Sequence, residues 1–138
     1  MKQIRLQRTL PHPVADAWEA LTDADAMAEW LMPNDFRPTV GHTFTFRTKP
    51  GPGFDGIAHG EVLAVEPEKM LQLRWQAGKL DTIVTFTLEP LGTDQTRLTL
   101  THTGFGWGDL TARLFLGFGW PKVIDRLGRS AAQRGAQR

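Results

Sequence analysis

The strongest constraint in this sequence is an alternation of apolar and polar residues, with a period of two, that begins near Phe36 and continues to Thr103. This alternation places successive side chains on opposite faces of a β-strand. Stretches containing Pro or Gly divide it into residues 43–47, 56–65, 70–75, 83–88 and 97–103. Because short connections join these segments, the sequence predicts an antiparallel meander.

One face of the predicted sheet is apolar and the other is polar. On residues 70–75, Leu71, Leu73 and Trp75 alternate with Gln72 and Arg74, and the following segments repeat this pattern. An apolar face must be covered by a second layer. The segment after Gly108 is the candidate, because Asp109 can cap a helix there and apolar residues recur at helical spacing.

The flanking segments predict one more strand and three helices. Residues 4–9 alternate with a period of two, and residues 14–21 and 24–30 read as short helices, the second capped by Asp23. Within the final helix, Pro121 removes a hydrogen bond at a cost of about 3 kcal/mol, which predicts a kink or break between an apolar front half and a basic rear half. We expect residues 133–138 to fray.

Composition limits the classes of function. A chain of 138 residues fits one domain spanning residues 1–138, and a net charge of +1 argues against nucleic acid as a partner. The absence of cysteine excludes disulfides and thiolate chemistry. The sequence shows neither a signal peptide nor an apolar stretch long enough to span a membrane, so we expect a soluble, cytoplasmic protein.

The order and spacing of many residues resemble a known family. The residues that match run along nearly the whole chain and include Pro13, Trp18, Leu21, Trp30, Pro33, Gly41, Phe44, Gly60, Val62, Glu66, Pro67, Leu71, Trp75, Phe86, Leu98, His102, Gly104, Phe105, Gly119, Trp120 and Leu127. The chain is similar to bacterial members of the activator of heat-shock-protein ATPase homologue family, within the START-like, pollen-allergen-like (SRPBCC) helix-grip superfamily.

This resemblance implies an α+β helix-grip fold. A curved antiparallel sheet of about seven strands would wrap on a long C-terminal helix, with two short helices after the first strand. Such domains typically enclose a cavity for a hydrophobic ligand, while stand-alone bacterial members mostly lack a demonstrated activity. The chain departs from the family at residues 114–118, where an apolar run replaces a commonly charged stretch. That run can form a homodimer contact or cover the core.

Aromatic and neighbouring polar side chains are the candidates for lining a ligand pocket. They are Trp30, Phe44, Phe46, His59, Glu61, Trp75, Phe86, His102, Phe105, Leu114, Phe118 and Trp120. The alternative is that the aromatic residues simply fill the core of a small domain.

Three of these candidates also have acid–base chemistry. His59 and Glu61 lie two residues apart, so they share one strand face. The apolar residues Ile57, Leu63 and Val65 fall on the same face, which predicts that both point inward. With His102 they form the set from which an enzyme would draw its acid and base. A hydrogen-bonded structural histidine is the commoner outcome, so we assign no catalytic residue.

Other catalytic motifs are missing. No metal-ligand spacing, phosphate-binding glycine loop or serine-hydrolase motif occurs, so we expect no metal and no cofactor. Arg126, Arg129 and Arg134 read as a solvated basic tail near the negative end of a helix.

Three hypotheses of function follow. The first is a non-enzymatic protein that binds a small hydrophobic molecule between the sheet and the final helix. The second is a co-chaperone-like module or stress-response regulator that contacts a chaperone-type protein through residues 114–118. The third is a cyclase- or hydratase-like enzyme that uses His59, Glu61 or His102.

Overall fold

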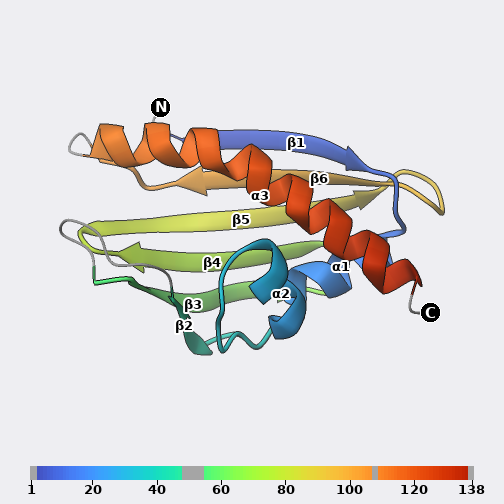
Figure 1. The fold of residues 1–138 in the computed structure, drawn as a ribbon, viewed down its shortest axis with the longest axis horizontal. Helices are drawn as coiled ribbons and strands as arrows, with labels where there is room; N and C mark the ends of the chain where they lie inside the picture. Colours follow the sequence, from blue (N-terminus) through green and yellow to red (C-terminus); the bar gives the residue numbers. More distant parts are fainter. Residues whose placement is uncertain (1–2, 48–54, 107–108, 137–138) are drawn as a thin grey trace.

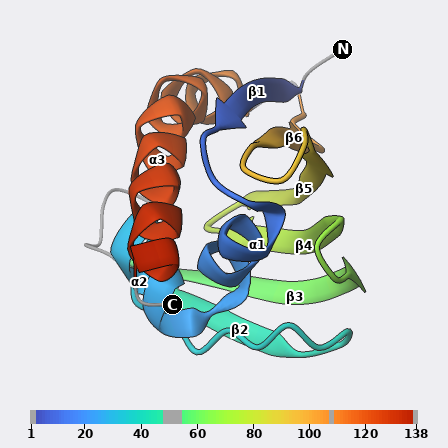
Figure 2. The same ribbon diagram turned by 90° about the vertical axis from the view of Figure 1, so that its right-hand side faces the viewer.

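The computed structural model describes residues 3–47, 55–106 and 109–136, with only the backbone described for residues 110–118. Within these residues, a curved antiparallel sheet carries helices on one face (Figures 1 and 2). The strands are β1 (Ile4–Leu10), β2 (Thr43–Arg47), β3 (Ile57–Glu66), β4 (Met70–Ala77), β5 (Leu80–Pro90) and β6 (Thr96–Thr103). The helices are α1 (Val14–Thr22), α2 (Ala24–Trp30) and α3 (Leu110–Ala136).

The sheet order β1-β6-β5-β4-β3-β2 confirms the predicted α+β helix-grip fold. The expected strand number is wrong, since the described residues form six strands rather than about seven. Residues 36–42, which precede β2, make a turn in which the His42 N–H donates to the Thr39 carbonyl oxygen over 3.0 Å. Because residues 36–42 turn back rather than run extended beside β2, only an isolated β-bridge between Asn34 and Phe46 forms on that side of β2.

Helix α3 runs across the sheet as one element, with Pro121 inside it (Figure 1). The sequence predicted a kink or a break at Pro121, and the break does not occur, because α3 continues through this residue as one helix. Proline removes only one backbone hydrogen bond of its own. Beyond it, Ile124, Leu127 and Ala131 are at most 1% exposed, and their burial in the core outweighs that local cost.

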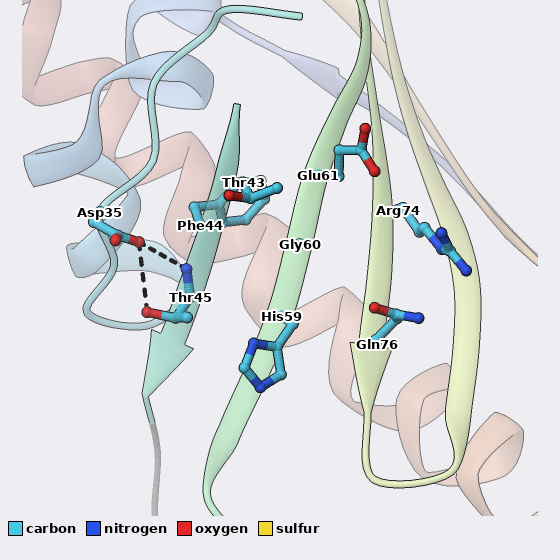
Figure 3. Close-up of a pocket in the computed structure, with 9 residues that line it drawn as sticks. All are labelled: Asp35, Thr43, Phe44, Thr45, His59, Gly60, Glu61, Arg74 and Gln76. Carbon is cyan, nitrogen blue, oxygen red and sulfur yellow. Dashed lines mark hydrogen bonds between the residues drawn. The ribbon is translucent and has the colours of Figure 1, made fainter. Parts of the chain in front are cut away.

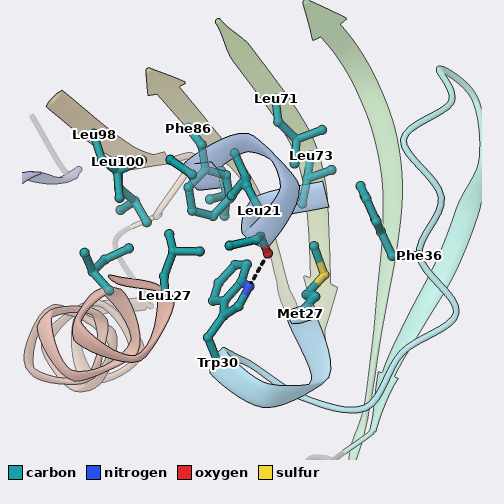
Figure 4. Close-up of a cluster of buried hydrophobic side chains, with 14 of the residues drawn as sticks. Leu21, Met27, Trp30, Phe36, Leu71, Leu73, Phe86, Leu98, Leu100 and Leu127 are labelled. Atoms are coloured by element: carbon teal, nitrogen blue, oxygen red, sulfur yellow. Dashed lines mark hydrogen bonds between the residues drawn. The ribbon is translucent and has the colours of Figure 1, made fainter. Parts of the chain in front are cut away.

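The core lies between the sheet and the three helices (Figure 4). Trp30 on α2 is fully buried, and its ring meets Phe86 of β5 edge to face at 6.0 Å. Its indole N–H donates to the Ala20 carbonyl oxygen over 2.7 Å, which pairs an orphan carbonyl at the end of α1. The cap predicted for α2 is confirmed, because Asp23 accepts from the Ala26 N–H at 3.0 Å.

The basic residues at the rear of α3 are not simply a solvated tail, as the sequence predicted. Arg126 donates to the Trp30 carbonyl oxygen at 3.3 Å. Arg134, whose side chain is only 13% exposed, lies 3.5 Å from Glu29 and 4.0 Å from Asp23. Because α2 and its capping residue Asp23 supply these partners, the arginines join α2 to the end of α3. Counting charges along the sequence does not reveal this pairing between distant segments.

Candidate functional site

Five ring side chains gather at one end of the concave face. Phe46 stacks on Trp75 with ring centroids 5.0 Å apart, and Trp75 meets Trp120 of α3 at 6.1 Å. His102 of β6 lies 5.9 Å from Trp120 and 4.6 Å from Phe105. We call Phe46, Trp75, His102, Phe105 and Trp120 the aromatic cluster. All five were pocket candidates in the sequence.

Hydrogen bonds connect the cluster in one direction. The Trp120 indole N–H donates to His102 Nδ1 at 3.1 Å, and indole nitrogen is a donor only, so Nδ1 must be unprotonated. The neutral ring then carries its proton on Nε2, which donates to Thr82 Oγ1 at 2.7 Å. The Thr82 hydroxyl in turn donates a hydrogen bond to the Trp75 carbonyl oxygen at 3.2 Å. We call this chain of bonds the His102 relay.

Burial keeps His102 neutral. The residue is 0% exposed, and desolvation lowers the pKa of its imidazole from 6.5 to about 4. Both ring nitrogens are occupied by the relay, so neither is left to exchange a proton with a ligand. The arrangement suits a structural histidine that fixes the orientation of Trp120 better than a general acid or base.

The remaining aromatic candidates occupy the core. Trp30 and Phe86 are at most 1% exposed and pack beneath the helices. Phe44 lies over Gly60 of β3, where an added Cβ would come within 2.3 Å of its ring. These three side chains are buried in the core. Glycine at position 60 leaves room for the Phe44 ring. Leu114 and Phe118, and the dimer contact predicted at residues 114–118, depend on side chains outside the described residues.

The inward orientation predicted for His59 and Glu61 is wrong. Ala58 and Val62 are the buried residues of this part of β3, at 3% and 0% exposure. The β3–β4 register shifts between Val62 and Ala64, which is a β-bulge. One extra residue reverses the alternation, so Val65 returns to the core side while His59 and Glu61 face outward.

His59 and Glu61 line a shallow hollow on the outer face, opposite the helices (Figure 3). The hollow measures about 390 Å³. Its lining residues are Asp35, Thr43, Phe44, Thr45, His59, Gly60, Glu61, Arg74 and Gln76. His102 is absent from this set and lies on the other face of the sheet, so the three acid–base candidates do not form one site.

Two charged side chains of the outer hollow, Asp35 and Arg74, are already hydrogen-bonded or paired. The Thr45 backbone N–H donates to Asp35 at 2.7 Å and lowers the pKa of that carboxyl. Arg74 makes two hydrogen bonds to Asp81, at 3.0 and 2.7 Å, which lower the pKa of Asp81 and raise that of Arg74. This pairing matches a solvated sheet surface.

Sequence reasoning missed Thr82, the middle member of the relay. Thr82 comes just before residues 83–88, the predicted strand. Several other threonines occur along β5 and β6, so its residue type does not set it apart. The only available signal was its two-residue spacing from Val84, which places both on the inner face. Thr82 is 1% exposed, and a buried polar residue needs a partner.

Within the described residues, the chain has neither a metal-binding group of side chains nor a membrane-spanning helix. In that part of the chain, no three His, Asp or Glu side chains are grouped so that they could hold a metal ion. Among the same residues, no helix combines the length and hydropathy that crossing a bilayer requires.

Comparison with known families places nearly the whole chain in one group. Residues 11–131 match the family model described as "Activator of Hsp90 ATPase homolog 1-like protein". A search of curated proteins found no match.

Solved structures share the fold. Protein MLL2253 from Mesorhizobium loti is 34% identical with a TM-score of 0.87, and the alignment covers 95% of this chain and 97% of that one. CalU16 from Micromonospora echinospora is 27% identical with a TM-score of 0.74, over 98% and 84% of the two chains. DynU16, described as a putative protein in the dynemicin biosynthetic locus, is 28% identical with a TM-score of 0.74. The alignment covers 94% of this chain but only 46% of DynU16.

Proposed function

Because this chain belongs to the Activator of Hsp90 ATPase homolog 1-like family, we propose that it binds a small hydrophobic molecule between the curved sheet and helix α3. The aromatic cluster carries this proposal. Its strand residues lie toward the end of the sheet that α1 and α2 leave uncovered (Figure 1). Trp75 and Phe105 there are 8% and 7% exposed, whereas Trp30 beneath the helices is 0% exposed.

The chemistry of the aromatic cluster indicates the class of ligand. The polar side-chain atoms of His102 and Trp120 bond to neighbouring side chains, so the cluster presents ring faces and edges. Aromatic rings favour stacked or edge-to-face neighbours. A flat polycyclic or long apolar molecule fits such a surface, as small-molecule sites are mostly apolar with a few fixed polar groups.

Titration with pyrene and with a fluorescent fatty acid tests the proposal. We expect saturable binding of at least one probe, accompanied by a change in tryptophan fluorescence. Phe105→Leu should weaken binding about three- to tenfold, the value of one aromatic contact. Phe36→Leu is the matched control, because it makes the same change at a residue 3% exposed and outside the aromatic cluster. No saturable binding of either probe, or equal weakening by both variants, would contradict the proposal.

A protein-interaction module is the second candidate function. The family description favours it, together with the apolar run at residues 114–118, which takes the place of a commonly charged stretch. In a pull-down with a purified chaperone of the Hsp90 class, we expect Phe115→Asp to lose the partner. Native mass spectrometry of the same variant tests homodimer formation through this run. Unchanged binding and an unchanged subunit number would count against the module.

A further inference from the structure

The two edges of the sheet differ in how their backbone groups are covered. At the β2 edge, the Arg47 N–H donates to the Pro33 carbonyl oxygen over 3.1 Å, and Asn34 forms a β-bridge with Phe46. The Thr45 N–H donates to Asp35. The loop before β2 therefore covers that edge. Within the described residues, β1 pairs with β6 alone and is the outermost strand on the opposite side (Figure 1).

Among the described residues, no second strand pairs with the side of β1 that faces away from β6. In an antiparallel pair, every second residue turns its N–H and C=O away from the partner strand. Arg8 donates from its guanidinium to the Gln7 carbonyl oxygen at 3.1 Å, which holds this side chain close to the strand backbone. An edge of this kind can accept a further strand.

A hollow of about 400 Å³ lies between the end of β1 and the rear half of α3. Leu10, Ile124 and Gly128 form an apolar part of its lining, and an added Cβ on Gly128 would touch the Leu10 side chain at 3.6 Å. Arg8 also lines it, because Arg8 shares the helix-side face of β1 with buried Leu10. Figure 2 shows β1 and α3 meeting at this corner of the molecule.

The polar rim of the hollow is cationic. Arg8 and Arg129 contribute two guanidiniums, His12 an imidazole, and Asp125 the carboxylate. The other two arginines of the rear helix, Arg126 and Arg134, are already bonded to residues of α2. Arg129 is exposed and, within the described residues, no ion pair to it is recorded. The excess of positive charge favours an acidic occupant.

We propose that β1 accepts an extended acidic segment of a partner protein as an additional strand beside it, at the edge next to the hollow formed with α3. Main-chain hydrogen bonds to β1 hold the segment. On the helix-side face of the segment, an apolar side chain meets the Leu10, Ile124 and Gly128 surface, and carboxylates on that same face meet Arg8 and Arg129. This interaction does not depend on the hydrophobic ligand site.

The probe is a labelled peptide of threonine–glutamate–threonine–valine repeats, in which glutamate and valine share one strand face, and the same peptide with lysine in place of glutamate is the comparison. Fluorescence anisotropy at low salt should show saturable binding of the acidic peptide only, weakening as salt rises. Arg8→Glu and Arg129→Glu should each weaken binding by roughly tenfold, because they replace attraction with repulsion. Arg37→Glu is the matched control, since it makes the same charge change on an exposed residue before β2 and should stay within about twofold.

Amide hydrogen exchange supplies the structural readout. The acidic peptide should protect every second amide along Ile4–Leu10 and leave the β2 amides unchanged. Binding without protection of β1, or equal weakening by Arg37→Glu, overturns the proposal. The proposal also fails if Arg8→Glu causes self-association while the affinity for the peptide stays the same. Arg8 would then serve only to prevent β1 from pairing with another chain.

Discussion

Acidification tests the His102 relay, because burial holds this imidazole neutral while the unfolded chain can protonate it. The pKa is about 4 in the folded protein and 6.5 in the reference state. At about 1.4 kcal/mol per pH unit, the difference corresponds to roughly 3 kcal/mol of unfolding free energy. The perturbation is therefore a sizeable fraction of the roughly 5–15 kcal/mol stability typical of such domains.

The sign follows from proton counting. Between pH 6.5 and about 4, the unfolded chain binds a proton at this histidine that the folded protein does not bind. The His102 contribution is thus fully present above pH 6.5 and is lost as the pH falls toward 4. Protonation of the folded ring would also place an N–H opposite the Trp120 N–H donor and break that hydrogen bond.

Urea unfolding at a series of pH values measures the effect. His102→Gln keeps one donor and one acceptor but does not titrate. The slope of unfolding free energy against pH therefore differs between this variant and the wild type only by the contribution of His102. Asp35 and Asp81, whose lowered pKa values also reduce stability at low pH, are common to both proteins and cancel. His59→Gln is the control on the outer face and should keep the wild-type slope. If His102→Gln retains that slope, the reasoning is refuted; His102→Asn repeats the comparison if glutamine prevents folding.

Three substitutions test the packing. Gly60→Ala should lower the free energy of unfolding by about 1–3 kcal/mol in urea denaturation, because its Cβ overlaps the Phe44 ring at 2.3 Å; wild-type stability would contradict this. Trp30→Phe removes the 2.7 Å hydrogen bond to a carbonyl of α1 and should cost about 1–3 kcal/mol, measured in the same way, and a negligible loss would show that this bond contributes little. Gly104→Ala should lower the melting temperature more than Gly92→Ala. Both glycines have positive φ, but only Gly104 has backbone within 3.2 Å of an added Cβ, so equal losses would count against the contact.

Local pattern was enough to predict most of the elements. The period of two located β4 at residues 70–75, and the structure extends it to Met70–Ala77. The capping aspartate located the start of α2, and helical spacing after Asp109 located α3. These predictions succeed because side-chain direction in a strand or helix depends on the immediate neighbours. The resemblance at individual residues, from Trp18 to Leu127, added the helix-grip arrangement.

The candidate site was predicted only in part. The aromatic residues of the cluster stood out because large rings are scarce and conspicuous, but a list of rings does not say which ones touch. His102 bonds to Thr82 and Trp120, 20 and 18 residues away, and no local period links those positions. The histidine looked like a chemical candidate in the sequence, whereas burial and two hydrogen bonds give it a structural role.

The sequence alone determined where strands and helices form and which side of most strands is apolar. Only the tertiary structure decided that a single bulged residue turns His59 and Glu61 outward, that six strands suffice, and that Pro121 is tolerated within α3. It also decided that the loop before β2 covers one sheet edge, whereas β1 at the other edge pairs, in the described part of the chain, with β6 alone. The physical reason is that backbone periodicity is a short-range property, while register, burial and edge coverage depend on contacts between segments far apart in the chain.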